Sequence, residues 1–266
     1  MADTRLRDAE RAWRSNLTDE GNYARLLSEH RRVGNFVIED LPEGYMFWNL
    51  PHCRNADGSS NPHAKVNVLW SKALLDYGNE RTQSKWVEWL KGKPWELADA
   101  QIAFSTMRAL YLNQTGWQSE LIKRVRVYLL GSVVGVGQGQ YSATLGTRVF
   151  YRNSGWDVVV HRFGMDNAYV ETGRFLRSDT GNIFNENCAQ VLLGVADLGE
   201  IQRICGYIAG RDIPVAIISF TQRSLEREFE ELERSVFFRI GRDPEEFFVS
   251  VIGADDRCGT IGIRWL

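Results

Sequence analysis

The sequence predicts an α+β fold, with a helical N-terminal half followed by a mixed, largely antiparallel sheet that packs with one or two helices. Apolar residues recur at helical spacing up to about Gly131 and at alternate positions after it. Of the 266 residues, 44% are hydrophobic and 25% are charged, as in a globular protein with a buried core. We therefore expect a predominantly helical region over 1–130, a glycine-rich connector over 131–146 and a β-rich α+β region over 147–266.

The N-terminal region begins with two helical patterns. Ala9 and Trp13 share the apolar face of a first helix, and a second helix over 18–34 has Thr18 as a cap and Gly34 as its end. Proline, glycine, serine and asparagine are then frequent over 41–63, which predicts loops. Helical spacing resumes at about Ala64.

Three more apolar stripes complete the predicted helical half. They lie over 86–90, 103–111 and 121–129. Thr115 and Gln118 have the spacing of a capping box in front of the last stripe. The glycines over 131–139 lack the third glycine of a dinucleotide-binding loop, because Gln140 stands at that position. We therefore interpret 131–146 as a connector.

A sheet is predicted from Thr147 onward. Alternating segments over 147–152, 156–163 and 167–175 are separated by turn residues. In a hairpin that turns at residues 165–166, position 162 would face Tyr169 and Asp157 would face Arg174. Contacts between these cross-strand neighbours would be structural and would not by themselves indicate a function.

The rest of the chain predicts further helices and strands. Asp197 and Glu200 have the spacing of a capped helix start, and Gly210 ends this helix before an apolar strand over 215–220. Leu225 to Val236 carry apolar residues at helical spacing among glutamates, which predicts an acidic surface helix over 224–236. Strands are expected over 247–252 and 260–266.

Charge and hydropathy favour a cytoplasmic protein without a membrane partner. Lys plus Arg is 32 and Asp plus Glu is 34, so the formal net charge of −2 gives no global attraction to nucleic acid or anionic lipid. The N-terminal residues are charged where a signal peptide would be apolar. The apolar stretch over 125–136 is too short to span a bilayer.

Two residue types add to this description. The four cysteines show no C-x-x-C spacing, so we expect free thiols. The chain is also arginine-rich: 26 of its 32 basic residues are arginine, which suits bidentate contacts to carboxylates and phosphates.

The candidate catalytic residues are His161, Asp157 and Cys188. Asp157 and His161 share one face of a predicted strand, but their Cα atoms would be roughly 13 Å apart, so they cannot form a dyad by themselves. His161 could act as a general base with a carboxylate from elsewhere. Glu171 is a poor partner because we expect it on the other face. Cys188, near a predicted helix start, could be a thiol nucleophile served by His161.

A local basic and aromatic cluster is the candidate binding surface for single-stranded nucleic acid. The alternative is a solvated helix face. The basic members and the tyrosine singled out with them are Lys123, Arg124, Arg126, Arg148, Arg152 and Tyr151.

No metal site is predicted, because His52, Cys53 and His63, with Asp57 between them, lack the paired spacing of zinc ligands. The sequence leaves the cofactor unknown. Three tryptophans, Trp86, Trp89 and Trp95, could form an aromatic partner surface or anchor the core.

The sequence therefore favours a cytosolic binding protein, a regulatory or assembly component that acts through protein contacts or self-association. The reason is that no catalytic residues stand at the spacing of a known catalytic motif. One alternative is a hydrolase that uses His161 with Cys188 or a carboxylate. The other is single-stranded nucleic-acid binding through the basic and aromatic cluster.

Overall fold

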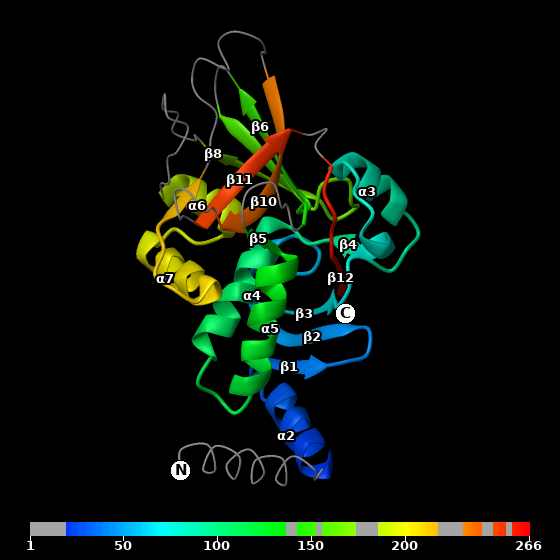
Figure 1. The fold of residues 1–266 in the computed structure, drawn as a ribbon, viewed down its shortest axis with the longest axis vertical. Coiled ribbons are helices and arrows are strands. Elements are labelled where there is room, and N and C mark those ends of the chain that lie inside the picture. Colours follow the sequence, from blue (N-terminus) through cyan, green and yellow to red (C-terminus); the bar gives the residue numbers. More distant parts are fainter. Residues whose placement is uncertain are drawn as a thin grey trace.

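The structure is a computed structural model and describes residues 20–136, 143–152, 156–173, 186–217, 231–240, 247–253 and 257–266. Within these ranges the fold is α+β, as predicted, with six α-helices and two sheets. Figure 1 shows the second sheet at one end of the molecule and helix α2 (Glu20–Arg32) at the other.

The first sheet forms early in the chain, so the prediction of a helical N-terminal half is only partly right. Strands β1 (Val37–Asp40), β2 (Gly44–Arg54) and β3 (Ser60–Ser71) are joined by β12 (Gly262–Trp265) and β4 (Glu96–Leu97), in the order β1-β2-β3-β12-β4.

The predicted loops over 41–63 and the predicted helix from Ala64 are therefore wrong. Strands β2 and β3 pair over most of their length, but the register shifts between Phe47 and Leu50 and again between His52 and Arg54. Asn49, in the first shift, has a left-handed backbone with φ 52°. These irregularities and two prolines hide the two-residue period of the hairpin, because bulges tolerate proline and displace the alternation.

The helices that follow agree with the apolar stripes. They are α3 (Gln83–Leu90), α4 (Ala100–Leu112) and α5 (Ser119–Ser132), with a short turn of left-handed backbone, η1 (Leu75–Gly78), before them. The predicted capping box is wrong, because α5 begins after Gln118, whose side chain makes no cap. The Gln118 amide instead hydrogen-bonds the backbone N–H and C=O of Ile38, which ties α5 to β1.

The second sheet contains the remaining strands. They are β5 (Val134–Val136), β6 (Thr147–Arg152), β7 (Asp157–His161), β8 (Tyr169–Gly173), β9 (Val215–Ile217), β10 (Glu231–Ile240) and β11 (Phe247–Gly253). Their order is β8-β7-β6-β10-β11-β9, and β5 also pairs with β10. Two pairings of β10 and β11, with β5 and β9, are parallel and the others are antiparallel, so the sheet is mixed and largely antiparallel.

Helices α6 (Glu186–Leu193) and α7 (Leu198–Ala209) pack with this sheet. The Asp197 carboxylate caps α7 by accepting from the N–H of Glu200 at 2.9 Å, and Gly210 ends the helix with φ 76°. Both predicted boundaries of this helix are confirmed.

Three expectations about the second half change. The acidic helix over 224–236 is wrong for residues 231–236, which lie in β10; residues 224–230 lie outside the described residues, as does the first predicted helix at Ala9 and Trp13. In β10 the ladders with β6 and β11 outweigh the helical spacing of the leucines. The connector contains the end of α5 and strand β5.

The hairpin of β7 and β8 is shifted by one residue from the predicted register. His161 pairs with Tyr169, and Asp157 pairs with Gly173. Arg162 leaves the strand with φ 52°, so the turn begins one residue earlier than the alternation suggests. Because of this shift, each of these residues of β7 faces a residue of β8 other than the predicted one.

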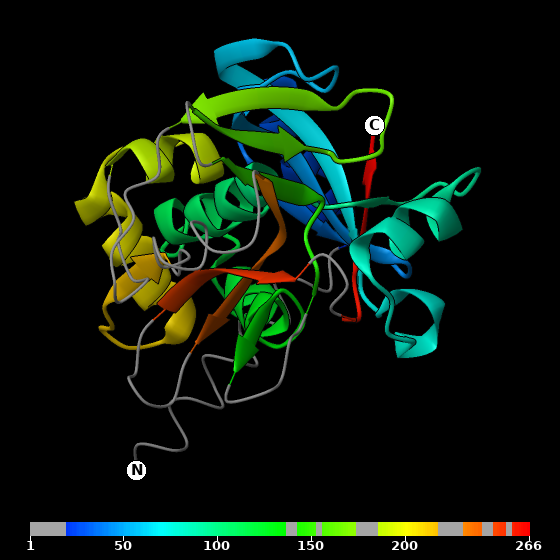
Figure 2. The same ribbon diagram turned by 90° about the horizontal axis from the view of Figure 1, so that it is seen from above.

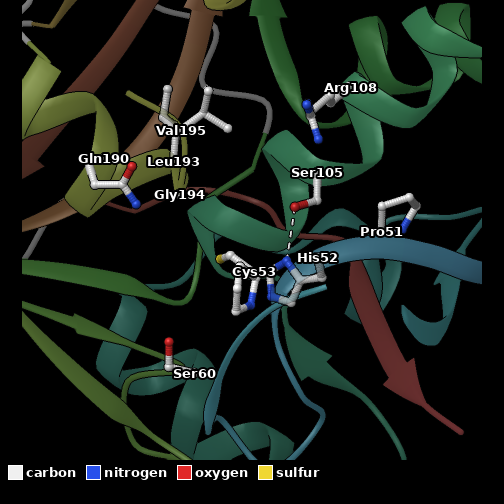
Figure 3. A pocket seen from close by; sticks show the side chains of 11 residues that line it. Pro51, His52, Cys53, Ser60, Ser105, Arg108, Gln190, Leu193, Gly194 and Val195 are labelled. Carbon is white, nitrogen blue, oxygen red and sulfur yellow. Dashed lines mark hydrogen bonds between the residues drawn. The ribbon is translucent and has the colours of Figure 1, made fainter. Parts of the chain in front are cut away.

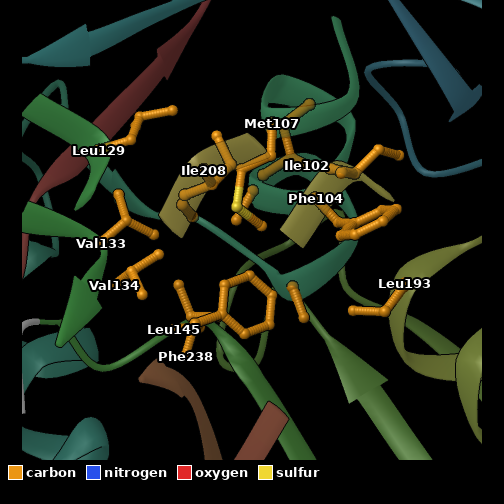
Figure 4. Packing of buried hydrophobic residues seen from close by; sticks show 14 of the residues in the cluster. Ile102, Phe104, Met107, Leu129, Val133, Val134, Leu145, Leu193, Ile208 and Phe238 are labelled. Atoms are coloured by element: carbon orange, nitrogen blue, oxygen red, sulfur yellow. The ribbon is translucent and has the colours of Figure 1, made fainter. Parts of the chain in front are cut away.

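One large cluster of buried apolar side chains joins both sheets and four helices. It includes Phe47 from the first sheet, Phe238 from the second, and residues of α4, α5, α6 and α7. Figure 4 shows Met107 of α4 beside Ile208 of α7 in this cluster. In the view from above, α3 and η1 stand out to one side (Figure 2). Among the described helices, none has the length and apolar character that crossing a membrane requires.

Candidate functional site

A polar cavity of about 400 Å³ opens beside the β2–β3 hairpin (Figure 3). Its walls come from β2, the start of β3, one face of α4, and the end of α6 with the loop that follows. The residues that line it are Pro51, His52, Cys53, Ser60, Pro62, Ser105, Arg108, Gln190, Leu193, Gly194 and Val195. The volume is in the range of small-ligand sites.

His52 and Ser105 form the central polar pair of the cavity. The His52 side chain is buried, and its Nδ1 lies 2.9 Å from Ser105 Oγ, as drawn in Figure 3. Burial lowers the pKa of His52 to about 4, with an opposing effect of the Asp99 carboxylate. The ring is therefore neutral at pH 7.

A neutral ring carries a proton on one nitrogen, and His52 Nε2 is buried without a hydrogen-bond partner among the described residues. An unpaired buried N–H is rarer than an unpaired buried acceptor. We therefore assign the proton to Nδ1, which donates to Ser105 Oγ, so the serine keeps its own proton.

Arg108 brings a cation to the cavity wall one helical turn beyond Ser105. Its Nε donates to Glu200 Oε1 at 2.7 Å, which ties α4 to α7. The Arg108 side chain is 39% exposed. No hydrogen bond of its two terminal nitrogens is found within the described part of the chain.

Cys53 lines the cavity as a protonated thiol. Burial raises the pKa of Cys53 to about 11, and the nearby carboxylates of Asp99 and Glu171 act in the same direction. The thiol donates to Gln101 Oε1 at 3.2 Å. It is therefore a poor nucleophile at pH 7.

Gln101 is fully buried behind Cys53 and connects three elements. Its Oε1 also accepts from the Tyr169 hydroxyl at 2.9 Å, and its Nε2 donates to Glu171 at 3.2 Å and to the C=O of Val191 at 3.1 Å. All hydrogen-bonding positions of the amide are thus used. This network fixes the cavity wall against β8 and α6.

Glu171 lies on the same face of the second sheet as His161, contrary to the prediction. Val159 pairs with Glu171, and His161 pairs with Tyr169. Because side chains alternate along a strand, Tyr169, Glu171 and Gly173 share one face, and the exposed residues between them lie on the other. The one-residue error in the predicted register places Glu171 on the wrong face. Its carboxylate forms an ion pair with Arg54, whose guanidinium also lies over the Tyr169 ring.

His161 is fully buried and both of its ring nitrogens have partners. Nε2 lies 2.9 Å from the C=O of Val191, and Nδ1 lies 3.1 Å from Thr147 Oγ1, which also accepts from the N–H of Ala100. Burial lowers the pKa of His161, so the ring is neutral, Nε2 donates to Val191, and Thr147 donates to Nδ1. The ring stacks on Tyr169 at 4.9 Å. His161 thus has no lone pair available for a substrate.

A buried ion pair lies deeper in the same region. Arg162 Nε is 3.5 Å from Asp99 Oδ2, and both side chains are almost inaccessible. Asp99 Oδ1 caps α4 by accepting from the N–H of Ile102 at 2.8 Å, while Arg162 stacks on Trp265 at 3.9 Å. The pair joins the start of α4 to the turn after β7.

The two ring nitrogens of His161 contact Thr147 and Val191, and not the other candidate catalytic residues, Asp157 and Cys188. Asp157 is buried on the same face of β7, and its Oδ1 accepts from the N–H of Arg152 at 2.9 Å. Cys188 is buried in the first turns of α6. Neither residue lines the cavity.

The predicted nucleic-acid surface is not formed as one exposed cluster. Arg148 is buried and paired with Glu233, and Tyr151 is buried in the core. Lys123 pairs with Glu120, Arg124 lies 3.5 Å from Asp40, and Arg126 donates to the C=O of Tyr207 at 3.2 Å. Arg152 is exposed at the end of β6.

One pattern in the sequence, in helix α4, could have indicated this cavity, although it did not yield any of the candidate residues above. Gln101, Ser105 and Arg108 follow the spacing i, i+4, i+7 along a helix that is otherwise mostly apolar and buried. A polar stripe on a buried helix predicts a polar cavity or network. His52 and Cys53 stood out in the sequence only as possible metal ligands. Across the described ranges, no three His, Cys, Asp or Glu side chains are grouped as a metal site requires.

Comparisons of the chain with protein-family models, with curated proteins and with solved structures find no match.

Proposed function

We propose that this protein acts by binding rather than by catalysis, as a regulatory or assembly component, and that the cavity beside the β2–β3 hairpin is its small-ligand site. The observation that carries the proposal is the geometry of the His52–Ser105 pair, in which the buried ring lies 2.9 Å from the serine hydroxyl through Nδ1. With the proton assigned to Nδ1, the ring orients the hydroxyl and does not take its proton. The pair is suited to recognising a ligand.

The hydrolase alternative finds less support. A general base needs a nitrogen lone pair that faces the reacting group. His161 directs its two nitrogens to Val191 and Thr147, and the thiol at the cavity, Cys53, is held protonated. Nucleic-acid binding is disfavoured by the burial of Arg148 and Tyr151.

The test is a ligand screen against a variant with a filled cavity. Ligand-detected NMR with a library of small polar compounds should give hits with the native protein. Val195→Trp places an indole at the cavity wall and should abolish them, whereas Val33→Trp, at a valine 57% exposed on the surface, should keep them. Hits that survive Val195→Trp would contradict the cavity as the site. Turnover of an aryl ester that Ser105→Ala abolishes would overturn the choice of binding over catalysis.

Protein contacts of such a component are expected at η1. Tyr77 is completely exposed, and both Asp76 (φ 50°) and Tyr77 (φ 57°) have left-handed backbones without being glycine. Such strain is commonly kept where a residue has to be presented. We expect self-association that Tyr77→Ala weakens, measured by sedimentation velocity over a range of concentrations. Sedimentation as a monomer at all concentrations would contradict self-association.

A further inference from the structure

We infer that the ligand of this cavity is a small hydroxy- or oxo-carboxylic acid, and that its carboxylate pairs with the terminal nitrogens of Arg108. This inference rests on the proposed function and names the ligand class for the same site. It follows from the charges, the geometry of the guanidinium and the character of the other walls.

The charged side chain at the cavity wall favours a negative ligand. Of the residues that line the cavity, Arg108 is the one with a formal charge, because His52 is neutral and Cys53 is protonated at pH 7. Arg108 pairs with Glu200 through Nε, as Arg54 pairs with Glu171 and Arg162 with Asp99 behind the wall. The two terminal nitrogens of Arg108 are the charged donors that remain at the wall, and a charge-assisted hydrogen bond from them favours an anion over a neutral ligand or a cation.

The guanidinium of Arg108 is oriented for a carboxylate. Glu200 accepts from Nε at 2.7 Å and so fixes the side chain from one edge. The edge formed by the two terminal nitrogens carries parallel N–H donors, which is the geometry that a carboxylate accepts in a bidentate pair. An arginine that is already held loses less conformational freedom when the ligand binds.

The other residues that line the cavity indicate which further chemical groups the ligand has. Pro51, Pro62, Leu193 and Val195 give apolar surface for a short carbon chain. Ser105 and Gln190 add hydrogen-bonding groups for a hydroxyl or keto oxygen. The walls from α6 come from its C-terminal end, which is partially negative, so the higher negative charge of phosphate is disfavoured more than the single charge of a carboxylate. A carboxylate held by Arg108 is therefore preferred over phosphate.

The experiment compares acids with their neutral analogues by isothermal titration calorimetry at pH 7. The probes are the monocarboxylates lactate, glycolate and pyruvate, the amides lactamide and glycolamide, and inorganic phosphate. At least one acid should bind, and its amide should bind about ten- to a hundredfold more weakly, because a charge-assisted hydrogen bond is lost. Phosphate should bind more weakly than that acid.

Variants then assign the charge to Arg108. Arg108→Gln should weaken the acid about tenfold or more and change the amide by less than about twofold. Arg108→Lys, which keeps the charge but not the planar fork, should fall between. Arg25→Gln, at an exposed arginine of α2, is the matched control and should bind like the native protein. Circular dichroism of each variant shows that it is folded.

The two proposals fail in different ways. If ligands bind and Val195→Trp abolishes binding, but Arg108→Gln leaves the acid unaffected or the amides bind as tightly as the acids, the cavity is a site and the carboxylate inference is wrong. If phosphate binds more tightly than every acid, the ligand class is wrong. If binding of every probe survives Val195→Trp, or none binds up to about 10 mM while the wider screen also gives no hits, the proposed function fails as well.

Discussion

His52 makes stability depend on pH. Its pKa is lowered from 6.5 to about 4 in the folded protein, so between these values the unfolded chain binds the proton more readily. The stabilisation by the neutral ring is complete above pH 6.5 and is lost as the pH falls toward 4. The full effect is about 3 kcal/mol, because each pKa unit corresponds to about 1.4 kcal/mol.

His52→Gln should therefore reduce the acid sensitivity of the protein. We expect urea unfolding of the native protein to give a lower free energy at pH 4.5 than at pH 7, and the difference should shrink in this variant. His63→Gln, at an exposed histidine, should keep the native difference. An unchanged pH dependence in His52→Gln would show that the ring is not held neutral by the fold.

Tyr77 carries a backbone conformation that glycine would adopt without strain. Because an L-residue in the left-handed region is strained by about 1 kcal/mol or more, Tyr77→Gly should raise the free energy of unfolding by up to about 1 kcal/mol. Tyr77→Ala removes the ring and keeps the strain, so it should not be stabilising. Urea unfolding of both variants makes the comparison, and a destabilised Tyr77→Gly would contradict it.

At the scale of elements, Gly44 is required where β2 begins. A Cβ atom at this position would lie 2.1 Å from the backbone oxygen of Trp70, which cannot move aside without breaking the β2–β3 ladder. Gly44→Ala should therefore destabilise the protein by at least about 1 to 3 kcal/mol.

Gly131→Ala is the matched control for this prediction. Gly131 lies near the end of α5, and a methyl group added there would meet open space, so alanine should be neutral or stabilising by up to about 1 kcal/mol. Gly44→Ala should lower the midpoint of thermal unfolding, and Gly131→Ala should leave it unchanged or raise it. A Gly44→Ala protein as stable as the native one would mean that the hairpin is not as closely paired as described.

The elements also show which parts of the fold are readable from the sequence. Helices α3, α4, α5 and α7 follow apolar stripes, and Asp197 and Gly210 mark the ends of α7 by local capping chemistry. The β2–β3 hairpin escapes prediction because its two register shifts break the alternation. Strand β10 escapes it because its pairing with β6 and β11 is set by residues distant in sequence.

The cavity is less predictable than the helices, for a related reason. His52 and Ser105 belong to different elements and meet only when β2 packs on α4. The position of Glu171 depends on a hairpin register that one residue decides. Individual residue types are recognisable in the sequence, whereas their neighbours follow from packing over long sequence separations.

At the scale of the whole molecule, the large apolar cluster predicts cooperative unfolding. It contains side chains from both sheets, so opening one sheet exposes the core of the other. Urea transitions followed by tryptophan fluorescence and by far-ultraviolet circular dichroism should coincide. Two separated transitions would instead support independent units corresponding to 1–130 and 147–266.

Strand β12 places a further demand on how the protein is made. Ile263 pairs with Trp70, and Gly262 pairs with Leu97, so β12 fills the position between β3 and β4. During translation, β3 has been synthesised long before this neighbour leaves the ribosome. Until β12 is made, the hydrogen-bonding edge of β3 stays unpaired in the nascent chain. Such an edge is a target for chaperones and for mispairing with other nascent chains.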